Sequence, residues 1–135
     1  MRDENELTGM VIEAAIKVHK ILGPGLFESV YQRVVPYELE LRGLHVQPKK
    51  MMPIRYGDLL IPDAFEADLV VEDQLIVELK SVEKLIPMHS KQLLTYLRLT
   101  GLRLGLLINF NVPMLKDGIV RLVNGFQPHS DVSSL

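Results

Sequence analysis

FEADLVVEDQLIVELK, from Phe65 to Lys80, has the pattern of two β-strands joined by a short polar turn. Side chains alternate across a strand, so one face of each strand is expected to be apolar and the other to carry the polar groups. The predicted apolar faces are Phe65, Ala67, Leu69 and Val71 on the first strand and Leu75, Val77 and Leu79 on the second. The two apolar faces must share one core, and this requirement constrains the register of the hairpin.

A three-residue turn over residues 72–74 satisfies that requirement. It pairs Leu69 with Val77 and therefore sets Asp68 opposite Glu78. A two-residue turn would instead mix apolar and polar side chains on each face. The sequence thus predicts two carboxylates directly opposed on neighbouring strands.

Opposed carboxylates lie about 5 Å apart at Cβ and repel each other, so a divalent cation between them would be stabilising. Mg²⁺ takes one or two carboxylates and keeps several waters for a substrate phosphate. Lys80 lies next to Glu78 on the same face, opposite Glu66, where it could orient an attacking water or neutralise a phosphate oxygen. The alternative is a surface ladder in which Lys80 only pairs with Glu66 or Glu78, since D-x₉-E-x-K arises easily by chance.

The periodicity elsewhere predicts two helices before the hairpin and a helix and strands after it. The expected helices cover residues 6–22, 27–42 and 87–100, and the expected strands cover residues 45–56, 59–61, 65–71, 75–82, 102–110 and 119–123. Pro36 is expected to kink or split the second helix. The order is that of an α/β protein with a mixed sheet of about four to five strands.

Composition and charge favour a single domain over residues 1–126 with a polar, frayed tail over residues 127–135. Absence of cysteine excludes thiolate zinc sites, and no apolar run approaches the roughly 18 residues of a membrane span. The charged N-terminus is unlike a signal peptide, so a cytoplasmic protein is expected. Residues 1–83 carry a net charge of −6 and residues 84–135 one of +4, so the last third could offer a phosphate-facing surface, although scattered solubilising charges are the simpler explanation.

Four segments, taken together and in order, resemble the GxxExxY protein family, a branch of the PD-(D/E)XK nuclease superfamily. They are GLFESVY (25–31), ADLVVEDQLIVELKSVEKL (67–85), HSKQLLTY (89–96) and GLLINFNVP (105–113). The resemblance covers about residues 6–124 and implies a restriction-endonuclease-like core, a mixed sheet flanked by helices with two helices N-terminal to it.

The resemblance also implies roles for the acidic residues and the lysine. Asp68 and Glu78 match the metal ligands and Lys80 the catalytic lysine, although Asp68 follows alanine where the motif has proline. Glu28 resembles the acidic residue that an early helix contributes as a further ligand or as a support for bound water; it could instead only favour the positive end of its helix. Asp63 forms a literal Pro-Asp pair but precedes the expected strand, and we interpret it as a decoy.

Five further residues are candidates for catalysis or substrate contact. Gln92 and Tyr96 match the QxxxY helix of the exonuclease branch, in which the glutamine approaches the site and the tyrosine holds DNA or the site wall. Tyr31 ends the GxxExxY motif, and it could equally be an aromatic residue at the core edge. Lys84 is a candidate phosphate contact, and His89 is a candidate ligand or proton carrier that could instead be structural.

These observations favour a Mg²⁺- or Mn²⁺-dependent nuclease that acts on DNA through a metal-activated water, in repair, recombination or defence. A different reading is a non-catalytic module that keeps the fold and binds nucleic acid or a protein partner. The small size of the chain favours a homodimer. A metabolic enzyme is disfavoured, because the sequence has no phosphate-binding glycine loop and no Ser-His-Asp arrangement in a recognisable context.

Overall fold

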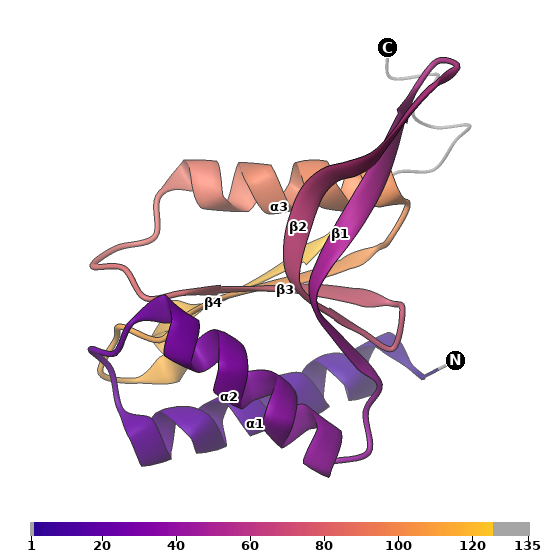
Figure 1. Ribbon diagram of the computed structural model, residues 1–135. Helices are drawn as coiled ribbons and strands as arrows, with labels where there is room; N and C mark the ends of the chain where they lie inside the picture. Colours follow the sequence, from indigo (N-terminus) through magenta and orange to yellow (C-terminus); the bar gives the residue numbers. More distant parts are fainter. Residues whose placement is uncertain (1, 126–135) are drawn as a thin grey trace.

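A computed structural model describes residues 2–125 and shows three helices and a five-stranded mixed sheet (Figure 1). The elements are α1 (Glu4–Leu22), α2 (Glu28–Leu41), β1 (Val46–Tyr56), β2 (Leu59–Val71), β3 (Leu75–Lys80), α3 (Pro87–Thr100), β4 (Leu104–Asn109), a short 3₁₀ turn (Leu115–Gly118) and β5 (Ile119–Val123). The predicted α/β class and the two helices before the sheet are confirmed. The expected polar tail, residues 127–135, lies outside the described residues.

The strands lie in chain order, β1-β2-β3-β4-β5, and only β3 and β4 run parallel. The parallel connection requires a crossover, and α3 supplies it. The predicted three-residue turn and register are confirmed, because Leu69 pairs with Val77 and Val71 with Leu75. Both Glu72 and Asp73 in this turn adopt positive φ.

The helices cover the sheet on both sides, with α1 and α2 on one face and α3 on the other (Figure 1). The larger core lies between the first two helices and the sheet and includes Leu7, Tyr31, Leu79 and Phe110, all fully buried. On the other face α3 approaches β4 closely at Gly105, where a Cβ atom would lie 3.0 Å from Leu97 Cδ1. The absence of a side chain at Gly105 therefore allows α3 to pack closely against β4.

The hairpin of β1 and β2 differs from the prediction in two ways. The expected strands at residues 59–61 and 65–71 are one continuous strand, and with β1 it forms a twisted ribbon that extends beyond the body of the protein (Figure 1). The expected apolar face of four residues is wrong, because Phe65 and Ala67 pack on the α3 side whereas Leu69 and Val71 pack on the side of α1 and α2. The alternation of side chains along β2 therefore shifts at Asp68: odd-numbered residues before it face α3, and odd-numbered residues after it face α1 and α2.

Pro36 does not split the second helix. The helix runs without interruption from Glu28 to Leu41, with Pro36 buried inside it. Burial of Glu38 on the same helix is accompanied by ion pairs to Lys17 of α1, at 3.2 Å, and to Arg42, at 3.3 Å. Tertiary contacts thus hold α2 against α1 despite the backbone hydrogen bond that proline removes.

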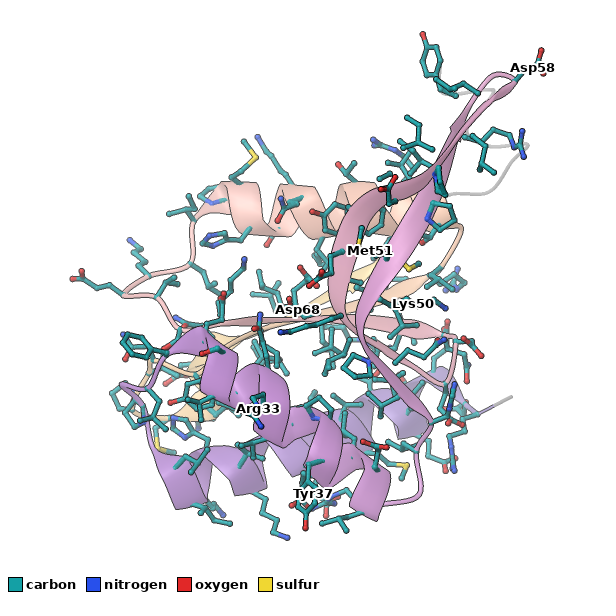
Figure 2. The ribbon with its side chains drawn as sticks, viewed as in Figure 1. Arg33, Tyr37, Lys50, Met51, Asp58 and Asp68 are labelled. Atoms are coloured by element: carbon teal, nitrogen blue, oxygen red, sulfur yellow. The ribbon has the colours of Figure 1, made fainter. Side chains whose placement is uncertain are left out.

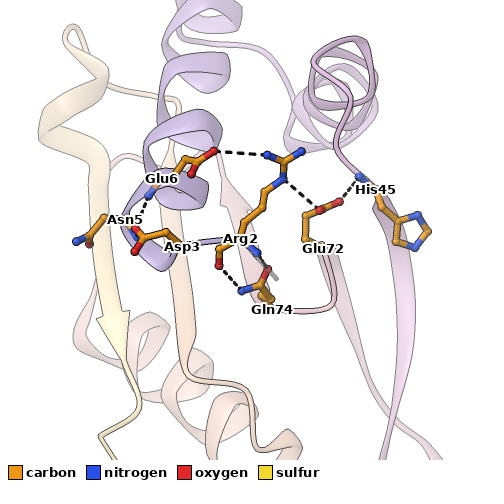
Figure 3. Close-up of polar contacts among 7 residues, drawn as sticks. All are labelled: Arg2, Asp3, Asn5, Glu6, His45, Glu72 and Gln74. Atoms are coloured by element: carbon orange, nitrogen blue, oxygen red, sulfur yellow. Dashed lines mark hydrogen bonds and ion pairs between the residues drawn. The ribbon is translucent and has the colours of Figure 1, made fainter.

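The N-terminus is attached to the β2–β3 turn (Figure 3). Arg2 exchanges two hydrogen bonds with the side chain of Gln74, and its Nε lies 3.2 Å from Oε1 of Glu72. The other oxygen of Glu72 accepts a 2.6 Å hydrogen bond from the amide of His45, and these donors lower the pKa of Glu72. The turn end of the hairpin is therefore fixed.

Within residues 2–125 there is no helix with the length and apolar character needed to cross a membrane.

Candidate metal centre

Strands β2 and β3 separate just beyond the Leu69–Val77 pair, and side chains replace the backbone ladder there. The amide of Asp68 donates a 2.8 Å hydrogen bond to Oε2 of Glu78. The amide of Leu79 donates a 2.9 Å hydrogen bond to Oδ2 of Asp68. We call this place the fork: Asp68, Glu78 and Leu79. The predicted juxtaposition of the two carboxylates is present.

The ladder on the other side of Asp68 is interrupted as well. The β1–β2 pairing includes Pro48 with Leu69 and Lys50 with Ala67 but passes over Lys49, which lies across from Asp68 with φ at +49°. A positive φ is unfavourable for a lysine, and strained backbone of this kind concentrates at functional sites. Asp68 thus sits where both neighbouring strands depart from regular pairing, between α2 and α3 (Figure 2).

Helix α2 is anchored so that its first turns approach the fork. Tyr31 is fully buried, stacks on Phe110 with ring centroids 4.3 Å apart, and donates a 2.6 Å hydrogen bond to the carbonyl of Gly23. Ser81, directly after β3, donates a 2.6 Å hydrogen bond to the carbonyl of Leu26. The loop before α2 is therefore tied to the end of β3. The candidate substrate role of Tyr31 is wrong on this placement, because its side chain is enclosed by protein.

One side chain of α2 contacts the fork directly. Nε2 of Gln32 lies 3.1 Å from Oδ1 of Asp68 and donates a hydrogen bond to it. Gln32 was not among the sequence candidates, although it follows Glu28 by four residues, a spacing that places both on one side of a helix. Glu28 itself is half-buried, and its negative charge contributes to raising the pKa of Glu78.

Burial raises the pKa values of both carboxyl groups, and the charge of a nearby carboxylate adds to this effect, Asp68 acting on Glu78 and Glu66 acting on Asp68. Glu78 is only 7% exposed, and burial, followed by the charge of Asp68, raises its pKa to about 8. Burial also raises the pKa of Asp68, against the opposing effect of hydrogen bonds from Leu79 and Gln32. Neighbouring carboxyl groups with raised pKa values are typical of functional sites, and a cation bound between them would favour their ionised forms.

Lys80 lies at the end of β3, half-buried and within electrostatic reach of the fork. Its positive charge lowers the pKa of Asp68 and of Glu78, in opposition to burial. The expected ladder position of Lys80 opposite Glu66 is wrong, because the β2–β3 pairing ends at Leu69 and Val77. The charge of Lys80 therefore acts on the carboxylates of the fork.

Asn109 positions the segment that follows Lys80. It is 2% exposed, accepts a 3.0 Å hydrogen bond from the amide of Val82 and donates a 2.9 Å hydrogen bond to the carbonyl of the same residue. The amide of Phe110 also donates to the carbonyl of Lys80, at 2.9 Å. Lys84 lies exposed in the loop that these contacts hold.

Helix α3 brings Tyr96 toward the fork. The ring of Tyr96 stacks on Phe65 of β2, with centroids 3.8 Å apart, and burial followed by the charges of Glu78 and Asp68 raises the pKa of its phenol. Gln92 lies one turn earlier on the same helix and is exposed. His89 is half-buried, and its Nδ1 accepts a hydrogen bond from the amide of Ile86, so this ring caps the start of its own helix. Asp63 is exposed and lies within β2, not before it as expected, and its interpretation as a decoy stays a prediction.

The donor set suits a hard divalent cation with an incomplete protein shell. Across residues 2–125 no group of three Asp, Glu or His side chains converges closely enough to hold a metal ion. Glu28 therefore does not complete a three-ligand cluster with Asp68 and Glu78. The two carboxylates at the fork still match Mg²⁺ or Mn²⁺, since such ions accept one or two carboxylates and fill their remaining positions with water and substrate oxygens.

A family model of the PD-(D/E)XK nuclease superfamily matches residues 5–122. The chain belongs to the PD-(D/E)XK nuclease superfamily. No curated protein and no solved structure gave a match. PD-(D/E)XK nucleases generally use divalent metals.

Proposed function

We propose that the chain is a Mg²⁺- or Mn²⁺-dependent nuclease that hydrolyses phosphodiester bonds in DNA. The observation that carries the proposal is the fork: two carboxylates with raised pKa values, held together where two strands separate, with a lysine on one of those strands. Membership of the superfamily supports nuclease chemistry of this general kind.

The two carboxylates of the fork and the neighbouring Lys80 have distinct roles in the proposal. Asp68 and Glu78 hold the metal. The metal, when bound, supplies Lewis-acid stabilisation and lowers the pKa of a water at the site. Lys80 holds its ammonium group beside the carboxylates, where it stabilises the negative charge that develops on the phosphate and orients the water that attacks phosphorus.

The surrounding residues receive supporting roles. Glu28 takes part from α2 as an outer support for bound water, and Gln92 approaches the scissile phosphate from α3. Tyr96 forms a wall against which DNA rests, supported by its stack on Phe65. Lys84 contacts a phosphate of the DNA backbone.

His89 extends the candidate DNA surface at the start of α3. Its ring already accepts a hydrogen bond at Nδ1, so Nε2 is the atom that we assign to a phosphate contact. We also assign the chain to the GxxExxY branch on its GLFESVY segment, and propose a cytoplasmic homodimer that acts in DNA repair or defence.

Cleavage of single- and double-stranded DNA in Mg²⁺, Mn²⁺ or EDTA, with wild type and Lys80→Ala, tests the proposal. We expect metal-dependent cleavage that falls at least about 100-fold in Lys80→Ala, because removal of one charge-stabilising group typically costs that much. Lys91→Ala is the matched control, since Lys91 lies exposed on α3 and is not assigned a role.

A non-catalytic nucleic-acid-binding module is the second candidate, and the formal net charge of −2 favours weak engagement of a polyanion by the single chain. Binding of DNA or RNA without cleavage in any metal would support this candidate and contradict the first. Cleavage that is equal in wild type and Lys80→Ala would contradict the role of Lys80.

A further inference from the structure

Asp68 is held at both of its carboxylate oxygens by two different elements of the fold. The amide of Leu79 on β3 donates to Oδ2 at 2.9 Å, and the side-chain amide of Gln32 on α2 donates to Oδ1 at 3.1 Å. A carboxylate with one donor can still rotate about its terminal torsion, whereas two donors on opposite oxygens fix its plane.

The element that carries Gln32 is rigid. The neighbouring residue Tyr31 is fully buried, stacked on Phe110 and hydrogen-bonded to Gly23, so the second turn of α2 has little freedom to move relative to the sheet. Gln32 is itself half-buried. Groups that orient metal ligands act most effectively from such fixed positions, since the ligand geometry must be held within a fraction of an ångström.

The hydrogen bond leaves Asp68 able to bind a cation. An ionised carboxylate has about four acceptor positions on its two oxygens, and Leu79 and Gln32 use one on each oxygen. Glutamine is suited to this position because its amide donates to Asp68 without adding a charge, whereas a third carboxylate would increase the repulsion that already raises the pKa of Glu78.

We propose that Gln32 is a positioning residue of the metal centre: its amide fixes the orientation of the Asp68 carboxylate and so sets the affinity for the divalent cation. This inference rests on the proposed function for the presence of the metal, but it is measured by metal binding and not by cleavage alone.

Binding of Mn²⁺ to metal-depleted protein, followed by electron paramagnetic resonance of the free ion, tests the proposal with Gln32→Met. Methionine keeps the length of the side chain and its helix propensity but removes the donor. We expect the Mn²⁺ dissociation constant to rise roughly 10- to 100-fold, the usual range for loss of a group that orients a metal ligand.

Gln74→Met is the matched control. Gln74 is also a half-buried glutamine, but it lies at the turn end of the same hairpin, where its side chain makes two hydrogen bonds to the backbone of Arg2 (Figure 3). We expect Gln74→Met to leave the Mn²⁺ dissociation constant within about twofold of wild type, because the two hydrogen bonds that it removes lie away from the fork.

Cleavage measured over a series of Mn²⁺ concentrations adds a second readout. We expect Gln32→Met to need more Mn²⁺ for half-maximal rate and to recover most of the wild-type rate at saturation. A role limited to folding would lower the rate at every Mn²⁺ concentration and would shift the denaturation midpoint in EDTA further than Gln74→Met does.

The outcomes separate the two proposals. An unchanged Mn²⁺ dissociation constant in Gln32→Met, or one changed equally in Gln74→Met, overturns the role of Gln32 even if the protein cleaves DNA. Binding of Mn²⁺ that depends on Asp68 and Gln32 without cleavage of any substrate supports this role and overturns the proposed function. Absence of Mn²⁺ binding in wild type overturns both.

Discussion

The backbone amide of Asp68 donates a 2.8 Å hydrogen bond to Oε2 of Glu78. Glu78 therefore has two properties that mutagenesis can separate: it accepts a buried hydrogen bond, and it carries a charge that burial disfavours. Glutamine keeps the acceptor and removes the charge, whereas alanine would leave the amide of Asp68 without this partner. The electrostatic predictions below therefore use Glu78→Gln.

Glu78→Gln is expected to make the stability of the metal-free protein less dependent on pH. The folded-state pKa of Glu78 is about 8, against an ordinary value of 4.5, so the folded protein retains a proton that the unfolded chain releases. The associated stability is fully present below about pH 4.5 and is lost as the pH rises through about 8. Glutamine does not ionise, so the variant avoids that loss.

Chemical denaturation in EDTA at several pH values measures this effect. The free energy of unfolding of Glu78→Gln relative to wild type should increase from pH 5 to pH 8.5 by on the order of 2–4 kcal/mol, at about 1.4 kcal/mol for each unit of pKa shift. Excess Mn²⁺ should narrow the difference at pH 8.5, because the cation binds the ionised carboxylate of wild type. A difference that does not change with pH would contradict the burial-induced shift.

Tyr31→Phe tests the structural role of this tyrosine. The variant keeps the stack on Phe110 but removes the hydrogen bond to the carbonyl of Gly23, so the free energy of unfolding should fall by about 0.5–1.5 kcal/mol. Tyr37→Phe, at an exposed tyrosine of the same helix, should change it by less than about 0.5 kcal/mol. A raised KM for DNA in Tyr31→Phe with unchanged stability would restore the substrate role.

Asn109→Ala is expected to loosen the segment after Lys80. It removes a buried side chain that bonds both the amide and the carbonyl of Val82, so a loss of about 2 kcal/mol in urea denaturation is expected. Asn111→Ala is the control, because the half-buried Asn111 contributes its backbone amide to this contact and alanine keeps that amide. Equal losses in the two variants would contradict the positioning role of Asn109.

The register of the central hairpin was predictable from the sequence because apolar alternation and the length of the turn leave few solutions. The pairing of Leu69 with Val77 follows from those two constraints, and the contact between Asp68 and Glu78 follows from that pairing. The end of α3 was predictable because glycine readily adopts the left-handed conformation that terminates a helix. Gly101 has this conformation in the structure.

The departures from prediction arise where tertiary structure overrides a local pattern. Alternation alone assigns Phe65 and Leu69 to one face, but the ribbon changes its buried face at Asp68, opposite the positive φ of Lys49. No periodic pattern encodes such a change. Pro36 is accommodated because α2 is held by its packing. Gln32 was accessible in principle from its i, i+4 relation to Glu28, but only the fold shows that this side of α2 meets Asp68.

The most direct test of the account is to titrate Mn²⁺ into wild type and Asp68→Asn and to record metal binding and DNA cleavage on the same samples. We expect wild type to bind Mn²⁺ and to cleave DNA over the same range of Mn²⁺ concentration, and Asp68→Asn to lose both while remaining folded. Cleavage that persists in Asp68→Asn, or Mn²⁺ binding that is unaffected by the substitution, would contradict a metal centre at Asp68 and Glu78.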